Sequence, residues 1–431
     1  MIRKQRLISF ILLVALLAGC VPGAISTGGM QAVQSSLARE SAPQVDLADG
    51  QSLAAGNNAF ALDLYRAVQS ESENVFFSPY SISLALAMTY AGANGETERQ
   101  MAETLHFTLP EDRLHPAFNA LDQELASRKD SGGGQGADGK GFRFNIVNDL
   151  WGQKDYEFQP EFLDTLAKNY GAGLRLLDFA TEPDAARKII NDYIAENTEQ
   201  RIKDLIPEGA IDVMTRLVLT NAIYFNAAWL FPFEKELTKD APFTKLDGST
   251  VTVPMMEMPS YESMNYADGE GYTAVALPYE NPSLQMLILL PDEGNFAAFE
   301  ESLDAARLES IVGELQFTSV RVKMPKFKIE GQFELGSTLA GLGMTDAFDP
   351  DRADFSGMNG KRDLYIGSVI HKSFVNVDEE GTEAAAATAV IMETASAPME
   401  MIDLTIDRPF LFLIRDVSTN TTLFMGRVAV P

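Results

Sequence analysis

Cysteine is almost absent from this chain, because Cys20 is the only one among 431 residues. No disulfide can therefore form within the chain, and cysteine clusters that bind zinc or iron–sulfur centres are excluded. The fold must be held together by packing instead. With 46% hydrophobic and 22% charged residues, the chain can bury a large core in one big domain or two smaller ones.

Histidine is nearly as scarce, and His106, His115 and His371 are the only three. A nucleophile triad needs a histidine base, but none of the three lies near a GxSxG elbow or at a metal-binding spacing. The sequence also lacks a P-loop, a GxGxxG motif and a CxxC pair. We therefore expect no enzyme activity, no metal and no cofactor, and interpret the histidines as structural.

Basic residues are too few and too scattered for a polyanion site. The formal net charge is -27, and counterion release from nucleic acid or anionic lipid needs clustered Lys and Arg. Nucleic acid is therefore excluded as a partner. The densest basic stretch is Arg3, Lys4 and Arg6, at the extreme N-terminus.

That basic start precedes an apolar run, Leu7–Leu17, and the tetrapeptide "LAGC" that ends at Cys20. The run is too short to span a bilayer, which needs about 20 apolar residues. The arrangement resembles a bacterial lipobox; the alternative is an ordinary secretory signal with a chance cysteine. It predicts a lipoprotein signal peptide over residues 1–19, lipid on Cys20, and a place on the cell surface facing the extracellular or periplasmic side.

Residues 20–54 are mostly small and polar, which is typical of a flexible, lipid-anchored tether, and a globular pattern runs over 55–431. A Gly-rich interruption, Ser127–Gly141, indicates an exposed loop. Helical periodicity is clear over 57–69 and 81–93, whereas the sequence pattern predicts strands over 284–291, 320–331 and 409–416. Helices and strands do not alternate regularly, so the fold class is α+β.

One stretch, "VDEEGTEAAAATAVIMETASAP" (Val377–Pro398), combines acids, a glycine and a run of small residues without any Lys or Arg. Read with the period of two of a strand, Thr382 and every second residue after it form an uncharged, buriable face up to Thr394. The charges of Glu383 and Glu393 share the other face. By composition alone, an Ala-rich helix end or a solvated loop remains an equal alternative.

Five blocks of sequence, in this order along the chain, resemble the signature blocks of the serpin family. They are "NVFFSPYSISLALAMTYAGANGETERQMAETLHF" (Asn74–Phe107), "NDYIAENTEQRIKDLI" (Asn191–Ile206), "LVLTNAIYFNAAWLFPF" (Leu217–Phe233), the stretch Val377–Pro398 and "DRPFLFLIRDVSTNTTLFMGRVAVP" (Asp407–Pro431). The resemblance covers residues 55–431. It implies three β-sheets surrounded by about eight or nine helices, with an exposed reactive-centre loop at about 379–407.

The resemblance also implies a function, that of a monomeric, single-use inhibitor of serine or cysteine proteases. The loop is bait, and after cleavage it inserts as a strand into the largest sheet, so the intact fold should be metastable. Small residues permit this insertion, and Gly381 gives the pivot backbone freedom. The residues that match the inhibitory hinge are Glu379, Glu380, Gly381, Thr382, Glu383, Ala384, Ala385, Ala386, Ala387 and Thr388.

Family spacing places the bait bond at Ala395–Ser396, and a small side chain before the bond suits elastase-like or subtilisin-like proteases. Thr394, Met399 and Met401 remain alternative bait residues. The residues that match the family's control points for sheet opening, the shutter and the breach, are Ser78, Ser81, Asn221, His371 and Trp229.

Two other functions stay open at this point. A non-inhibitory binding protein with the serpin fold would be cleaved without forming a covalent complex. A solute-binding lipoprotein of a transport system would share the anchor and the acidity but lack the signature blocks.

Overall fold

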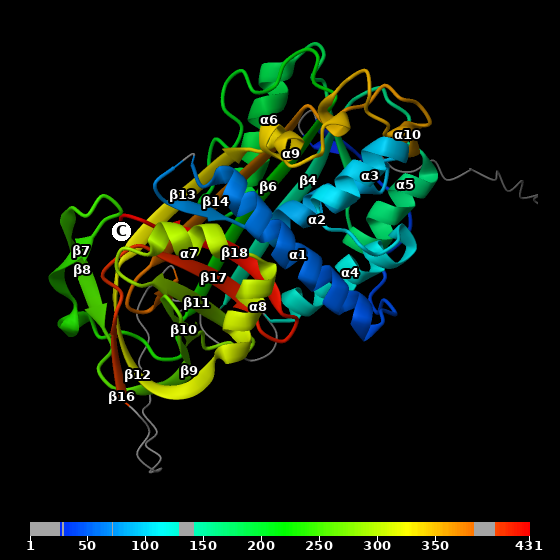
Figure 1. Cartoon of the computed structure of the whole chain (residues 1–431). Helices are drawn as coiled ribbons and strands as arrows, with labels where there is room; N and C mark the ends of the chain where they lie inside the picture. The colour runs from blue at the N-terminus through cyan, green and yellow to red at the C-terminus, as the bar shows by residue number, and fades with distance from the viewer. Residues whose placement is uncertain (1–25, 28–29, 71, 129–141, 383–400) are drawn as a thin grey trace, which may run out of the picture.

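Two large β-sheets with helices packed around them form the computed structural model (Figure 1). It describes residues 26–27, 30–70, 72–128, 142–382 and 401–431. The α+β class is confirmed. The resemblance implied three sheets, but the described residues form two. Two of the expected sheets are joined because strand β12 pairs with β9 through its first half and with β8 through its second.

The first sheet has eight strands in the order β1-β2-β5-β4-β6-β15-β14-β13. Its central strand β6 is buried along its whole length, as its nearly continuous apolar sequence favours, whereas β13 alternates between buried and exposed residues. The strands are β1 Ser26–Thr27, β2 Met30–Val33, β4 Arg143–Gln153, β5 Leu174–Leu177, β6 Leu217–Ala228, β13 Phe327–Glu334, β14 Ser368–Val377 and β15 Gly381–Thr382.

The second sheet has ten strands, nine of them in the order β3-β18-β17-β11-β10-β9-β12-β8-β7, while β16 pairs in parallel with β12. The expected strand over 284–291 is confirmed as β11. The strands are β3 Val75–Phe77, β7 Lys239–Thr244, β8 Thr250–Glu257, β9 Glu262–Gly269, β10 Tyr272–Pro278, β11 Leu284–Pro291, β12 Gln316–Pro325, β16 Met401–Thr405, β17 Phe410–Asp416 and β18 Thr421–Val428.

Ten α-helices lie in the described ranges, slightly more than the eight or nine expected. They are α1 Leu47–Val68, α2 Pro79–Tyr90, α3 Gly95–Thr104, α4 Glu111–Ser127, α5 Pro160–Thr165, α6 Pro183–Asn197, α7 Phe296–Ser302, α8 Ala305–Glu314, α9 Gly336–Gly341 and α10 Ser356–Asn359. Short 3-10 turns, η2 Lys235–Leu237 and η3 Asp346–Phe348, and a π-turn, η1 Leu166–Tyr170, complete the set. No helix of the described residues is both long and apolar enough to cross a membrane.

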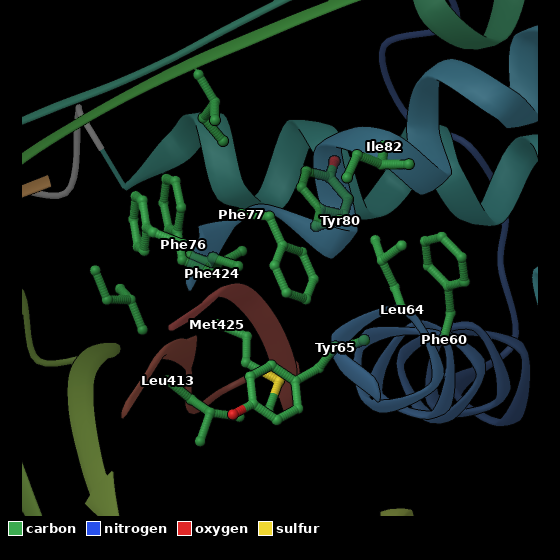
Figure 2. Close-up of a cluster of buried hydrophobic side chains, with 14 of the residues drawn as sticks. Phe60, Leu64, Tyr65, Phe76, Phe77, Tyr80, Ile82, Leu413, Phe424 and Met425 are labelled. Carbon is green, nitrogen blue, oxygen red and sulfur yellow. The ribbon is translucent and has the colours of Figure 1, made fainter. Parts of the chain in front are cut away.

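The core lies where α1 and α2 pack against β3 and β18. Figure 2 shows Phe60 and Tyr65 of α1, Phe77 of β3 and Phe424 of β18 in one buried cluster. Helix α2 is buried at every position, and Ser78 caps its first turn by accepting a hydrogen bond from the Ser81 backbone N–H. This rigid helix therefore holds Ser78 and Ser81 beneath the first sheet.

The segment before α1 is docked onto the body, which differs from the flexible tether expected over 20–54. Gln31–Val33 pair antiparallel with Leu174–Leu176 at the edge of the first sheet. Farther along, Arg39 binds the Asp122 carboxylate at 2.7 Å, and α1 begins at Leu47. A small, polar sequence gave no sign of this because edge pairing uses backbone N–H and C=O groups, which every residue here carries.

Candidate functional site

The start of the hinge is already seated inside the first sheet. After β14 the chain turns back, with the Asp378 N–H donating to the Gly381 carbonyl at 3.0 Å. Thr382 then pairs with Val377 of β14 on one side and Ala227 of β6 on the other. Its side chain is fully buried. Strand β15, Gly381–Thr382, is therefore inserted between β6 and β14, and Thr382 is its residue paired on both sides, on the buried face that the period of two predicts.

Below this point β6 and β14 pair directly with each other. Ser368–Phe374 lie in parallel register with Val218–Tyr224. Any further insertion of the chain after Thr382 must break these pairs and replace them with new ones. We call the boundary between β6 and β14 the seam. The hinge enters the seam at its open end, and the rest of the seam is closed by the direct pairing of Ser368–Phe374 with Val218–Tyr224.

An aromatic pair holds the buried hinge residue. The Tyr279 hydroxyl lies 2.9 Å from that of Thr382, and the Tyr279 ring stacks on Trp229 at 4.6 Å between ring centroids. The Trp229 indole N–H donates to the Asp378 carbonyl at 3.0 Å, and its backbone N–H donates to the Glu380 carbonyl at 3.0 Å. Burial raises the pKa of Tyr279 well above its usual value, so its hydroxyl stays protonated. Trp229 therefore binds the turn that leads to Thr382, and its role as the breach residue stays a prediction of the resemblance.

Charged residues fix the turn that leads into the hinge. Glu379 is buried, yet its carboxylate pairs with Lys326 at 2.6 Å and accepts a hydrogen bond from the Thr238 hydroxyl at 2.6 Å. Burial alone would raise the pKa of Glu379, but the hydrogen bonds from Lys326 and Thr238 outweigh it and hold that pKa below its usual range. Glu380 forms an ion pair with Lys235.

A second polar cluster lies beneath the closed part of the seam. His371 of β14 is opposite Asn221 of β6, and Asn221 is opposite Asn148 of β4, so the three lie in register across adjacent strands. Ser81, from α2, donates through its hydroxyl to the Asn148 side-chain oxygen at 3.0 Å. The Ser78 hydroxyl donates to the Leu423 carbonyl at 2.6 Å, which ties the cluster to β18.

The donor and acceptor of each hydrogen bond around His371 follow from the Ser78 backbone N–H. The Ser78 backbone N–H can only donate, so the His371 Nε2 atom, 3.2 Å away, must accept. The proton of the neutral ring is then on Nδ1, which donates to the Asn221 side-chain oxygen. Asn221 in turn donates to Ser81 and Asn148. Burial lowers the pKa of His371 to about 3, which keeps the ring neutral near pH 7.

The four shutter residues expected from the sequence thus form one network, and separating β6 from β14 would break its His371–Asn221 link. Sequence reasoning missed several of the partners: Asn148, Tyr279, Thr238 and Lys326. Asn148 did leave a signal, because it interrupts an apolar alternation with Phe144, Ile146 and Leu150 on the core face of β4. The other three lie far from the hinge in sequence and carry no motif.

Several expected site residues fall outside the described residues: Cys20, the bait pair Ala395 and Ser396, the alternatives Thr394 and Met399, and the hinge residues Glu383, Ala384, Ala385, Ala386, Ala387 and Thr388. Met401 is described, and it is the first residue of β16, paired with Ser319. A residue held in a sheet is a poor bait, because a protease binds its substrate as a free extended segment. In the described ranges, no group of three or more His, Cys, Asp or Glu side chains could hold a metal ion.

Comparison with known proteins gives a consistent result. Residues 55–431 match the family model described as "Serpin (serine protease inhibitor)". The human leukocyte elastase inhibitor is 40% identical over 388 residues, covering 88% of this chain and 99% of that protein. The corresponding protein of Xenopus tropicalis is 39% identical over 379 residues, covering 86% and 97%.

Solved structures also match. Tengpin, a thermophilic serpin solved in its native state, is 29% identical with a TM-score of 0.79, covering 93% of this chain and 98% of tengpin. Uncleaved ovalbumin is 26% identical with a TM-score of 0.76, covering 88% of this chain and all of that one.

Proposed function

This chain belongs to the serpin family of protease inhibitors, whose relatives are named as inhibitors and not as enzymes, and on that premise we propose that it is an irreversible suicide-substrate inhibitor of serine proteases. The observation that carries the proposal is the position of Thr382, fully buried between β6 and β14 above a seam that is still closed. The small residues that follow it in sequence can continue the strand.

The chemistry follows in three steps. The protease serine attacks the carbonyl carbon of Ala395, the Ser396 amine leaves with a proton, and Ala395 remains bound to the protease as an acyl ester. The freed loop then extends strand β15 beyond Thr382. About 14 inserted residues at about 3.3 Å each carry the acylated protease roughly 45 Å. Pulling the acylated serine out of position distorts the protease's oxyanion hole, in which one donor alone contributes about 10²- to 10³-fold in rate, so the ester persists.

The two polar clusters have separate roles in this sequence. Tyr279 holds Thr382 and Trp229 holds the turn before it, whereas His371 and Asn221 link the strands that must still part. Insertion therefore extends from an open end against a hydrogen-bonded seam. This arrangement keeps the intact form metastable until cleavage frees the loop.

The bait residue and the relatives support the same class of target. Alanine before the scissile bond suits the shallow specificity pocket of elastase-like or subtilisin-like proteases, and the human and Xenopus tropicalis relatives are named leukocyte elastase inhibitors. We further propose that the protein acts as a monomer on the cell surface, held by lipid on Cys20.

A protease panel tests the inhibitory function. Mature protein is incubated with elastase-like, subtilisin-like, chymotrypsin-like, trypsin-like and cysteine proteases, then analysed on a denaturing gel, because an acyl ester survives SDS. We expect a stable complex and a released C-terminal peptide that begins at Ser396. Ala395→Arg should shift inhibition towards trypsin-like enzymes. Cleavage without any stable complex would instead indicate a non-inhibitory binding protein.

A matched pair of hinge variants tests the mechanism. In Thr382→Arg the arginine must either leave the sheet or be buried as an unpaired charge, at a cost of several kcal/mol. Insertion should therefore become slower than deacylation, and the variant should be cleaved as a substrate. Glu383→Arg changes the neighbouring residue, which the alternation places on the outer face, and should still trap protease. Equal trapping by both variants would contradict insertion along this face.

A further inference from the structure

Two large apolar side chains are exposed together where the chain emerges from the bait segment. Phe317 of β12 is 72% exposed and Met401 of β16 is 67% exposed. Met401 is paired with Ser319, and Phe317 lies two residues before Ser319 on the same strand. Side chains two apart share a face, so Phe317 and Met401 are diagonal neighbours on one face of the sheet. In Figure 1, β9, β12 and β16 lie side by side at the lower end of the molecule.

Charged groups beside this pair are already satisfied by one another. The Asp403 carboxylate accepts hydrogen bonds from the Tyr261 hydroxyl and the Arg321 guanidinium, both at 2.8 Å. Arg321 also lies over the Tyr261 ring, 4.9 Å from its centroid. An apolar centre beside paired polar groups is the anatomy of a protein–protein contact, in which Phe and Met are enriched.

The position of Met401 along the chain indicates that the target protease would cover this surface. Met401 follows the expected bait bond by five residues, so at most about 17 Å of extended chain separates Ser396 from it. A protease of about 230 residues has a radius of gyration of about 17 Å. A protease bound at that bond must therefore extend over the surface near Met401.

We propose that Phe317 and Met401, bordered by Tyr261, Arg321 and Asp403, form a docking surface for an apolar patch on the target protease, beside the cleft that holds the residues after the scissile bond. This surface rests on the proposed function and adds a determinant of target choice that is separate from Ala395. It acts on the first, non-covalent complex and not on loop insertion. Its loss should therefore slow association without changing the fraction of protease that is trapped.

The test compares Phe317→Ala/Met401→Ala with Met214→Ala, a change at a methionine that is 59% exposed and precedes β6, at the opposite end of that strand from the hinge. Affinity is measured for the protease identified by the panel, with its nucleophilic serine replaced by alanine so that only the non-covalent complex forms. We expect the double variant to weaken this affinity at least about tenfold, while Met214→Ala binds like the wild type. Melting temperatures of all three should agree, because the altered side chains are exposed.

Trapping by active protease separates this inference from the proposed function. A double variant that associates more slowly but traps the same fraction of protease supports the docking surface. Equal affinity for the wild type and the double variant overturns it, whether or not trapping occurs. Tight binding that depends on Phe317 and Met401 but never yields a covalent complex retains the surface and overturns the inhibitory mechanism. Wild-type protein that dimerises through these residues in light scattering would assign the surface to a second copy and also overturn the proposal.

Discussion

The hydroxyl oxygens of Thr382 and Tyr279 lie 2.9 Å apart, and both side chains are fully buried. Tyr279 begins the turn after β10, in the second sheet, and Thr382 lies in the first, so this hydrogen bond joins the two sheets at the point where the hinge enters. The ring of Tyr279 also stacks on Trp229, whose indole binds the chain just before the hinge. One tyrosine thus holds both the hinge residue and the tryptophan that anchors its turn.

Tyr279→Phe should loosen the seated hinge. It keeps the stacked ring but removes the hydroxyl partner of a buried threonine, which costs about 1–3 kcal/mol. We expect faster hydrogen exchange at Gly381 and Thr382. The control is Tyr365→Phe, which removes a hydroxyl bonded to the Met214 carbonyl at 2.9 Å on the exposed surface and should leave that exchange unchanged. Unchanged exchange in both variants would rule out a role for Tyr279 in holding the hinge.

Acid should destabilise the fold through its buried histidines. Burial lowers the pKa of His371 to about 3 and that of His115 to about 4, whereas in the unfolded chain both bind a proton near pH 6.5. Between these values the unfolded state binds more protons, so the free energy of unfolding falls as pH falls from about 6.5 towards 4. The loss is about 1.4 kcal/mol per pH unit for each histidine.

Urea unfolding at pH 7, 6 and 5 measures this slope, and His371→Gln should make it shallower by one histidine's share. Protonation of His371 would also remove the acceptor for the Ser78 N–H. Identical slopes for wild type and His371→Gln would show that His371 does not remain neutral in the folded protein.

Lys326→Met should destabilise the turn before the hinge, because it removes the cation from the buried carboxylate of Glu379. Since the Lys326 side chain is 37% exposed, we expect a loss of about 1–3 kcal/mol in the free energy of unfolding, and not the larger cost of a fully buried pair. Lys328→Met is the matched control, because Lys328 pairs with Glu330 where both are exposed and should cost less than about 1 kcal/mol. Similar losses from the two changes would count against a structural role for the Lys326 pair.

The docked N-terminal segment should contribute to stability. A chain that begins at Asp46 loses the pairing of Gln31–Val33 with Leu174–Leu176 and the contacts of Arg39 with Asp122 and Asn119. We expect a lower melting temperature and faster hydrogen exchange in β5 than in a chain that begins at Met30. Matching values for the two chains would mean that the docked segment adds no stability.

Strong periodicity made much of the fold predictable. The run "LQMLILLP" coincides with β11, Leu284–Pro291, because a short, wholly apolar segment has few other places than a buried strand. The helices expected over 57–69 and 81–93 are likewise confirmed in the main, although α1 ends at Val68 and α2 at Tyr90, so 91–93 lie beyond the helix. The pairing of β2 with β5 was not predictable, because it depends on the backbone and on an open neighbour far along the chain.

Some residues of the candidate site could likewise be predicted from the sequence, and others could not. Ser78, Ser81, Asn221 and His371 could be named from the sequence blocks, and the structure brings them together. Thr382 was expected to be the first hinge residue buried, but its seated position and its bond to Tyr279 depend on contacts between segments more than a hundred residues apart, about which local pattern says nothing. Lys326 and Thr238 were missed because they too contact the hinge from other segments of the chain and carry no motif.

The docked N-terminal segment also changes how far the protein could reach from a membrane. If Cys20 carries lipid, a free spacer up to residue 54 would let the body swing widely, with a fully extended length of about 120 Å. Because β2 begins at Met30, only ten residues separate the anchor from the folded body, which gives a tether of about 35 Å at most. The edge of the first sheet that carries β2 and β5 would then face the bilayer. A surface protease would meet an inhibitor held close to the membrane in a restricted orientation. The effective concentration of the inhibitor would then depend on the height of the protease's active-site cleft above the membrane.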